Sequence, residues 1–192
     1  MASTLDVQML QTAASLENLA VEAYEAVARS RGHDPLLDSF VRRTRAQHAA
    51  HAVAFNRAAV RAGGREQLLA DPRYVGPVRR ALADQAGVAA VPALASLLET
   101  LEDAKAQTYA RFASLSDPRL RSMFVSVAAV EAGHRAFLLA ALKLLSLGEP
   151  LASGDRPAGL PDHLPADLGA GSCPHAFYPT TESAAVDEGV VR

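Results

Sequence analysis

The chain has 192 residues and a formal net charge of −2, with 49% hydrophobic but only 5% aromatic residues. This length and apolar content are sufficient for one domain with a sizeable core. The 19 Lys and Arg residues are scattered along the sequence. Because no basic stripe is present, we exclude nucleic acid as a partner. The apolar residues are mainly Ala, Leu and Val, which favour helices over a β-sandwich or barrel, so we expect an all-α fold.

The N-terminus and the cysteine content bear on the compartment. Residues 1–7 lack the basic and apolar regions of an export signal. No run reaches the roughly 18 apolar residues that a membrane span requires. Cys173 is the single cysteine, which excludes a disulfide scaffold. We therefore expect a soluble, cytoplasmic protein without a membrane partner.

Two helices are predicted in the first third of the chain. The first covers about 6 to 30, where apolar or inward-type positions recur in alternating steps of three and four. The second covers about 36 to 62 and stops at Gly63. His48 and His51 lie on its inward stripe, where apolar residues are normally found.

A long connection and two further helices follow. Residues 63 to 91 contain prolines and glycines and one short amphipathic piece, roughly 77 to 86. The next two helices cover about 92 to 115 and about 118 to 147. Short loops within each pair and a long crossover between the pairs predict an antiparallel four-helix bundle.

The predicted bundle occupies residues 1–148. Residues 149–192 are rich in Pro, Gly and Asp, so we expect an irregular tail. The segment that begins at Cys173 contains Ala-Phe-Tyr-Pro and could pack back on the bundle.

The two predicted hairpins repeat one plan. Ser15–Tyr24 aligns with Thr100–Tyr109 without a gap, matching Leu-Glu and the Tyr seven residues later. The pair His48-Ala-Ala-His51 corresponds to Glu131-Ala-Gly-His134, each about 30 residues further along. Each hairpin therefore supplies one lone Glu and one pair of residues at i and i+3.

The repeat places metal-binding side chains on the inward face of the bundle. Residues at i and i+3 share one helix face, and a buried carboxylate without a cation is unfavourable. This set of carboxylates and imidazoles suits iron first, with manganese or zinc as alternatives, rather than copper(I) or calcium. The candidate ligands are Glu17, His48, His51, Glu102, Glu131 and His134.

Three further residues are candidates for supporting roles. Glu99 lies one turn before Glu102 and could replace it or add a ligand. Tyr24 and Tyr109 lie two turns beyond the lone glutamates, in reach of a hydrogen bond to a ligand. We interpret both tyrosines first as core residues, and we assign no catalytic residue.

The segments Ser-Leu-Glu-Asn-Leu-Ala, Gln-His-x-x-His-Ala-x-Ala-Phe-Asn and Ala-Phe-Tyr-Pro-Thr resemble bacterial proteins of the ferritin-like superfamily, over about 6 to 148. The resemblance implies a four-helix bundle with a di-iron type of site, as in ferritin or rubrerythrin. In that plan two helices each give a Glu and the other two give Glu-x-x-His. Glu17, Glu102, Glu131 and His134 match it, whereas His48 stands where the plan has Glu. The site thereby loses a negative charge, which leaves one metal, zinc or no metal open.

The leading functional hypothesis is a metal-binding protein, with a di-iron or di-manganese oxidoreductase acting on oxygen or peroxide as its enzymatic form. The alternative is a non-enzymatic bundle that acts by binding or assembly, in which the Glu and His side chains form a metal-free network. Iron storage is a third hypothesis and requires a shell of many subunits. The sequence leaves the oligomeric state open, with a homodimer as the commonest assembly.

Overall fold

The structure is a computed structural model that describes residues 3–29, 35–83, 91–147 and 180–191. Within these residues the chain forms five α-helices and no β-strand, so the predicted all-α fold is confirmed. The helices are α1 (Thr4–Arg29), α2 (Pro35–Arg61), α3 (Pro72–Ala83), α4 (Val91–Leu115) and α5 (Pro118–Ser146).

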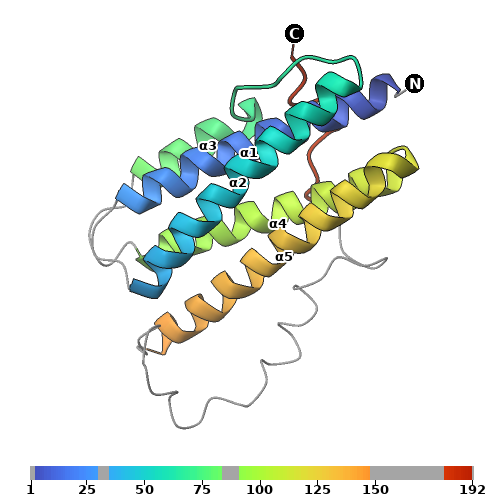
Figure 1. Cartoon of the computed structure of the whole chain (residues 1–192). Helices are drawn as coiled ribbons and strands as arrows, with labels where there is room; N and C mark the ends of the chain where they lie inside the picture. The colour runs from blue at the N-terminus through green and yellow to red at the C-terminus, as the bar shows by residue number, and fades with distance from the viewer. Residues whose placement is uncertain (1–2, 30–34, 84–90, 148–179, 192) are drawn as a thin grey trace.

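The four long helices pack as two hairpins (Figure 1). α1 lies along α2 and α4 lies along α5, while α3 packs against α1 and α4 in the connection between the hairpins. The four long helices begin and end within two residues of the predicted positions, a difference expected where helix ends fray.

The connecting helix α3 begins earlier than predicted. We expected an amphipathic piece over about 77 to 86, but the helix covers Pro72–Ala83. Asp71 starts it, because the Asp71 carboxylate accepts a 3.0 Å hydrogen bond from the backbone N–H of Arg73. Pro72 suits the first helical position, where no N–H donor is needed. Gly76 and Pro77 lie inside this helix, which continues through both.

Local signals fix the other helix ends. Ser3 and Asp6 form a reciprocal capping box at the start of α1, with Ser3 N donating to Asp6 Oδ2 at 2.9 Å and Asp6 N donating to Ser3 Oγ at 3.1 Å. Asp117 caps α5 by accepting from the Arg119 N–H at 2.9 Å. α2 is followed by Gly63 with φ of +90°, a conformation that glycine adopts without strain.

Two apolar clusters fill the bundle, one on each side of its midpoint. One includes Leu19 of α1 and Leu98 of α4, and the other includes Met9 of α1 and Phe124 of α5. Buried charged side chains from all four long helices lie between them. The inward stripes are therefore apolar towards both ends and polar in the middle.

The last described segment, residues 180–191, packs against the bundle. Gly189 N donates to Thr12 Oγ1 of α1 at 3.0 Å, and Ala184 N donates to Thr108 Oγ1 of α4 at 2.9 Å. This segment therefore ties α1 of one hairpin to α4 of the other (Figure 1). Residues 148–179 of the predicted tail, Cys173 included, lie outside the described residues.

By length and composition, α5 could cross a membrane, with an 18-residue window of mean hydropathy 1.4. Core helices of soluble proteins pass the same test, and 44% of that window is buried inside the structure. Glu131 and His134 of this helix are buried in the polar layer. The finding is compatible with a soluble protein.

Candidate metal centre

The six candidate ligands meet in the middle of the bundle. α1 and α4 each contribute one glutamate, α2 contributes two histidines, and α5 contributes a glutamate and a histidine. Five of the six residues are buried, and the His51 side chain is 18% exposed. We call this group the Glu/His cluster: Glu17, His48, His51, Glu102, Glu131 and His134.

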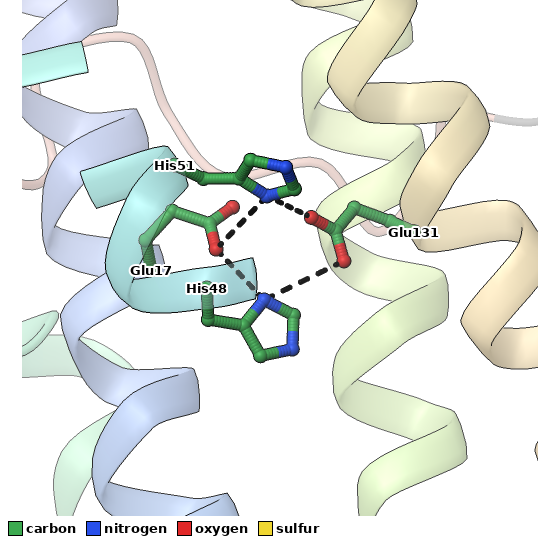
Figure 2. A group of neighbouring side chains, drawn as sticks. All are labelled: Glu17, His48, His51 and Glu131. Carbon is green, nitrogen blue, oxygen red and sulfur yellow. Dashed lines mark hydrogen bonds and ion pairs between the residues drawn. The ribbon is translucent and has the colours of Figure 1, made fainter. Parts of the chain in front are cut away.

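One half of the cluster is a ring in which carboxylates and imidazoles alternate (Figure 2). His48 Nδ1 lies 2.9 Å from Glu17 Oε2, and His51 Nδ1 lies 3.0 Å from Glu131 Oε1. Longer contacts close the ring, at 3.8 Å from His51 Nδ1 to Glu17 Oε2 and 3.7 Å from His48 Nδ1 to Glu131 Oε2. One ligand atom from each residue lies within 4.8 Å of the others, close enough for one cation to contact all four after small side-chain shifts.

The other half consists of His48, Glu102, Glu131 and His134. His48 Nε2 lies 3.0 Å from Glu102 Oε1. His134 Nδ1 lies 3.1 Å from Glu131 Oε2 and 3.5 Å from Glu102 Oε2. The two halves share His48 and Glu131, so the cluster has the form of a two-cation site with a carboxylate at the junction.

Lys105 of α4 lies at this junction and was not predicted. Its Nζ is 2.8 Å from His48 Nδ1, 3.1 Å from Glu131 Oε2 and 3.3 Å from Glu17 Oε2. A fourth contact, to Glu102 Oε2, measures 3.6 Å. The residue is fully buried, so one ammonium group neutralises part of the charge of all three carboxylates.

The sequence contained a signal for Lys105. It follows Glu102 by three residues and precedes Tyr109 by four, which places it on the same inward stripe. In the internal repeat its counterpart is Ala20. Because the two hairpins differ at this position, the repeat itself does not mark Lys105 as a site residue.

The contacts of His48 Nδ1 cannot all be favourable in the protein alone. Glu17 Oε2 at 2.9 Å is an acceptor and requires a proton on Nδ1, whereas the Lys105 ammonium at 2.8 Å is a donor and requires a lone pair there. Whichever nitrogen holds the proton, one contact is repulsive. The junction of the cluster is therefore electrostatically frustrated.

Glu102 Oε2 supplies a second sign that the cluster is incomplete. It is the one buried side-chain oxygen or nitrogen in the described part of the chain that has no hydrogen-bond partner. His134 Nδ1 faces it at 3.5 Å and Lys105 Nζ at 3.6 Å, but neither contact is a hydrogen bond. Burial lowers the pKa of His134, but Glu102 and Glu131 outweigh it and raise the pKa, while His134 Nε2 lies 2.9 Å from Gln47 Oε1. A cation that displaces the proton of His134 Nδ1 could be bound by this nitrogen and by Glu102 Oε2 together.

Each tyrosine of the repeat donates to the glutamate of the other hairpin. Tyr24 Oη lies 2.6 Å from Glu102 Oε1, and Tyr109 Oη lies 2.5 Å from Glu17 Oε1. Burial and the neighbouring carboxylates raise the pKa of both phenols well above the ordinary value. Both are therefore neutral donors that orient the carboxylates.

The charges of the cluster shift the pKa values of its members. Burial raises the pKa of Glu17 and Glu102, but the Lys105 charge more than compensates and holds both pKa values well below the ordinary range. Burial and Lys105 lower the pKa of His48, yet Glu102 and Glu131 outweigh them and raise it to about 9. Burial lowers the pKa of His51, whereas hydrogen bonds to Glu131 and Glu17 raise it to about 9. Without a metal, protons and Lys105 thus balance the carboxylates.

Glu99 lies apart from the cluster. Its Oε1 accepts a 2.8 Å hydrogen bond from Arg135 Nε, in an ion pair between α4 and α5. Arg135 also lies 3.3 Å from Asp103. The structure therefore brings Glu102, and not Glu99, to the other ligands from α4.

A family model for the ferritin-like domain matches residues 5–144. The chain belongs to the ferritin-like family. No curated protein and no solved structure matched it. The matched region extends from α1 into α5 and contains every residue of the Glu/His cluster and Lys105.

This ferritin-like domain departs from the four-carboxylate plan at two places. His48 replaces a carboxylate, and Lys105 adds a positive charge at the junction. Three carboxylates and three imidazoles nevertheless form a donor set that suits iron, manganese or zinc. Together with Glu102 Oε2, which accepts no hydrogen bond, this donor set fits a transition metal.

Proposed function

We propose that the protein binds a divalent transition metal at the Glu/His cluster, iron first with manganese or zinc as alternatives, and uses it to handle dioxygen or peroxide. The observation that carries the proposal is Glu102 Oε2, a buried carboxylate oxygen that accepts no hydrogen bond and lies 3.5 Å from His134 Nδ1. Burying such an atom costs free energy, which the Lys105 ammonium at 3.6 Å offsets only in part and a directly bound cation would offset more fully.

The residues around the cluster have the roles that a metal site needs. Gln47 fixes the His134 ring with Nδ1 towards the carboxylates, and Tyr24 orients Glu102. The apolar clusters on either side exclude bulk water. A bound iron or manganese ion would supply one-electron chemistry with dioxygen or peroxide.

The surroundings of the cluster favour a small substrate. The side chains of His51 and His134 are 18% and 9% exposed, so both reach solvent, whereas the three glutamates are fully buried. Two surface depressions are lined by Glu22, Arg29 and their neighbours, and by Asp6, Asp117 and their neighbours, respectively. Neither touches the cluster. Access beside the two histidines suits an ion, dioxygen or peroxide rather than a large organic molecule.

Elemental analysis of protein purified without chelator tests the proposal. We expect one to two equivalents of transition metal per chain, and less than a tenth of an equivalent, even after reconstitution, would contradict it. Glu102→Gln should remove most of the metal. Glu99→Gln is the matched control, because it changes a glutamate one turn away on the same helix that pairs with Arg135 instead.

The second candidate is a non-enzymatic bundle with a metal-free network, and Lys105 is the observation that favours it. Its ammonium contacts Glu17, Glu102 and Glu131, all within 3.6 Å. Thermal melts with and without chelator separate the two candidates, because a ligand bound only by the folded state raises the melting temperature. A melting temperature that chelator and added metal both leave unchanged would favour the network.

A further inference from the structure

Lys105 is one of only two lysines in the chain. The other, Lys143, is exposed on α5, whereas Lys105 is fully buried in the centre of the cluster. Taking an ammonium group out of water is costly unless buried negative charge surrounds it. Glu17, Glu102 and Glu131 provide that charge. The ammonium thus lies among the three carboxylates whose charge a metal ion would otherwise balance.

The formal charges match one divalent ion rather than two. Three carboxylates contribute −3 and Lys105 contributes +1, which leaves −2 when the imidazoles are neutral, as metal ligation requires. Two divalent ions would leave a buried excess of positive charge. One divalent ion makes the site neutral.

The hydrogen-bond geometry around Lys105 also favours a single metal ion. An ammonium has three N–H donors, and three acceptors surround Lys105 Nζ: His48 Nδ1 at 2.8 Å, Glu131 Oε2 at 3.1 Å and Glu17 Oε2 at 3.3 Å. These contacts require a lone pair on His48 Nδ1. If His48 Nε2 binds a cation, the ring stays neutral and Nδ1 accepts from Lys105. Glu17 Oε2, which lies 2.9 Å from Nδ1, then has Lys105 Nζ at 3.3 Å as its donor.

The one buried polar side-chain atom without a hydrogen bond among the described residues belongs to the half of the cluster that lacks Glu17. Glu102 Oε2 has no hydrogen bond, His134 Nδ1 faces it, and His48 Nε2 is 3.0 Å from Glu102 Oε1. The ammonium makes its three shortest contacts with residues of the half that contains Glu17, and its contact with Glu102 of the other half is longer, at 3.6 Å.

We propose that Lys105 acts as a built-in cation in one of the two cation positions, so that the centre takes a single divalent transition-metal ion, held by Glu102, Glu131, His134 and His48. This inference rests on the proposed function, since it assumes that the cluster binds metal. It assigns Glu17 to the lysine rather than to the metal.

Metal stoichiometry tests the inference. Chelator-treated wild type, Lys105→Met and Lys143→Met are dialysed against excess Zn²⁺ or Mn²⁺, and bound metal per chain is measured. We expect one equivalent for wild type and for the Lys143→Met control. Lys105→Met should bind two, because it removes the ammonium but keeps a side chain of similar length.

The outcomes separate the inference from the proposed function. Two equivalents in wild type, or one in a folded Lys105→Met, would overturn the inference and leave metal binding intact. No metal in wild type would overturn both. If Lys105→Met does not fold, the metal affinities of Glu102→Gln and Glu17→Gln test the inference instead.

Glu102→Gln should weaken metal binding by about 100-fold, as loss of a ligand does. Glu17→Gln should keep one equivalent, since Glu17 contacts Lys105 at 3.3 Å. Equal losses of affinity in the two variants would show that Glu17 is a metal ligand and overturn the assignment.

Discussion

Tyr24 Oη donates a 2.6 Å hydrogen bond to Glu102 Oε1, from the first hairpin to the second. Its counterpart in the repeat, Tyr109, donates back to Glu17. The two carboxylates differ in their other contacts. Glu102 Oε1 also lies 3.0 Å from His48 Nε2. Glu17 Oε1, in contrast, has its hydrogen bond within the described residues from Tyr109. A near-symmetric scaffold therefore supports two unequal carboxylates.

Replacing each tyrosine with phenylalanine should lower both stability and metal affinity, but the variant with the larger loss should differ between the two measurements. In chelator-treated protein, Tyr109→Phe should lower the free energy of unfolding by about 2–3 kcal/mol, because it leaves a buried charged oxygen without a partner. Tyr24→Phe should cost less, about 1–2 kcal/mol, since Glu102 Oε1 keeps His48. Urea unfolding followed by circular dichroism measures both.

Metal affinity should fall more in Tyr24→Phe than in Tyr109→Phe, the opposite of the order expected for stability. Tyr24→Phe frees Glu102, an assigned ligand, and should weaken metal binding by about 10-fold or more. Tyr109→Phe acts on Glu17, which contacts Lys105, and should change the affinity less. Finding the larger loss of affinity in Tyr109→Phe would contradict the assignment of Glu102 to the metal.

Lys105→Met should destabilise the metal-free protein strongly. Removing one partner from a buried ionic group leaves uncompensated charge and typically costs about 3–5 kcal/mol. Added Zn²⁺ should restore much of the loss, because a second ion can then take the place of the ammonium. Lys143→Met, at the exposed lysine of α5, should stay within about 0.5 kcal/mol of wild type. A Lys105→Met protein as stable as wild type in chelator would show that the carboxylates bind protons instead.

The sequence was sufficient for much of the fold and for the meeting of the six side chains. Glu17 and Glu102 were identifiable because the repeat places both on inward stripes, and a bundle with short loops has few ways to pack. Lys105 was missed because a lysine is normally exposed and its counterpart, Ala20, is apolar. Burial of a charged side chain depends on partners from other helices, which local periodicity does not record.

The contacts of residues 180–191 show the same limit. Gly189 N bonds to Thr12 Oγ1, and the two residues are 177 positions apart. Composition indicated an irregular tail, but no periodic signal pairs a turn segment with one face of a helix. Such contacts depend on close shape complementarity between the two backbones.

Gly189→Ala tests that close fit. A Cβ at this position would lie 2.1 Å from Ser15 Oγ and 2.7 Å from Thr12 Cα, so the segment would have to move away from α1. We expect a loss of about 1–3 kcal/mol, as for other overpacked sites. Gly133→Ala is the control, because a Cβ there meets nothing within 4 Å and a helical alanine gains about 0.5–1 kcal/mol over glycine. Equal stability of the two variants would contradict the packing of residues 180–191 on α1.

The pH dependence of stability should differ between the metal-free and the metal-loaded protein. The pKa values of His48 and His51 rise from 6.5 to about 9 in the folded chain. A raised folded pKa stabilises the protein fully below the unfolded pKa, and this contribution is lost as the pH rises through the folded pKa. In chelator, the free energy of unfolding should therefore fall between about pH 6.5 and pH 9, by about 1–3 kcal/mol.

Metal should reverse that trend, because ligation requires neutral imidazoles and so becomes more favourable as protons leave. The difference in melting temperature between loaded and chelated protein should grow from pH 6 to pH 8. His51→Gln should reduce the slope in chelator, because it removes one of the two groups whose pKa rises to about 9. Stability in chelator that stays constant or increases from pH 7 to pH 9 would show that the imidazoles are neutral without metal. The Lys105 ammonium would then be the main charge that balances the three carboxylates.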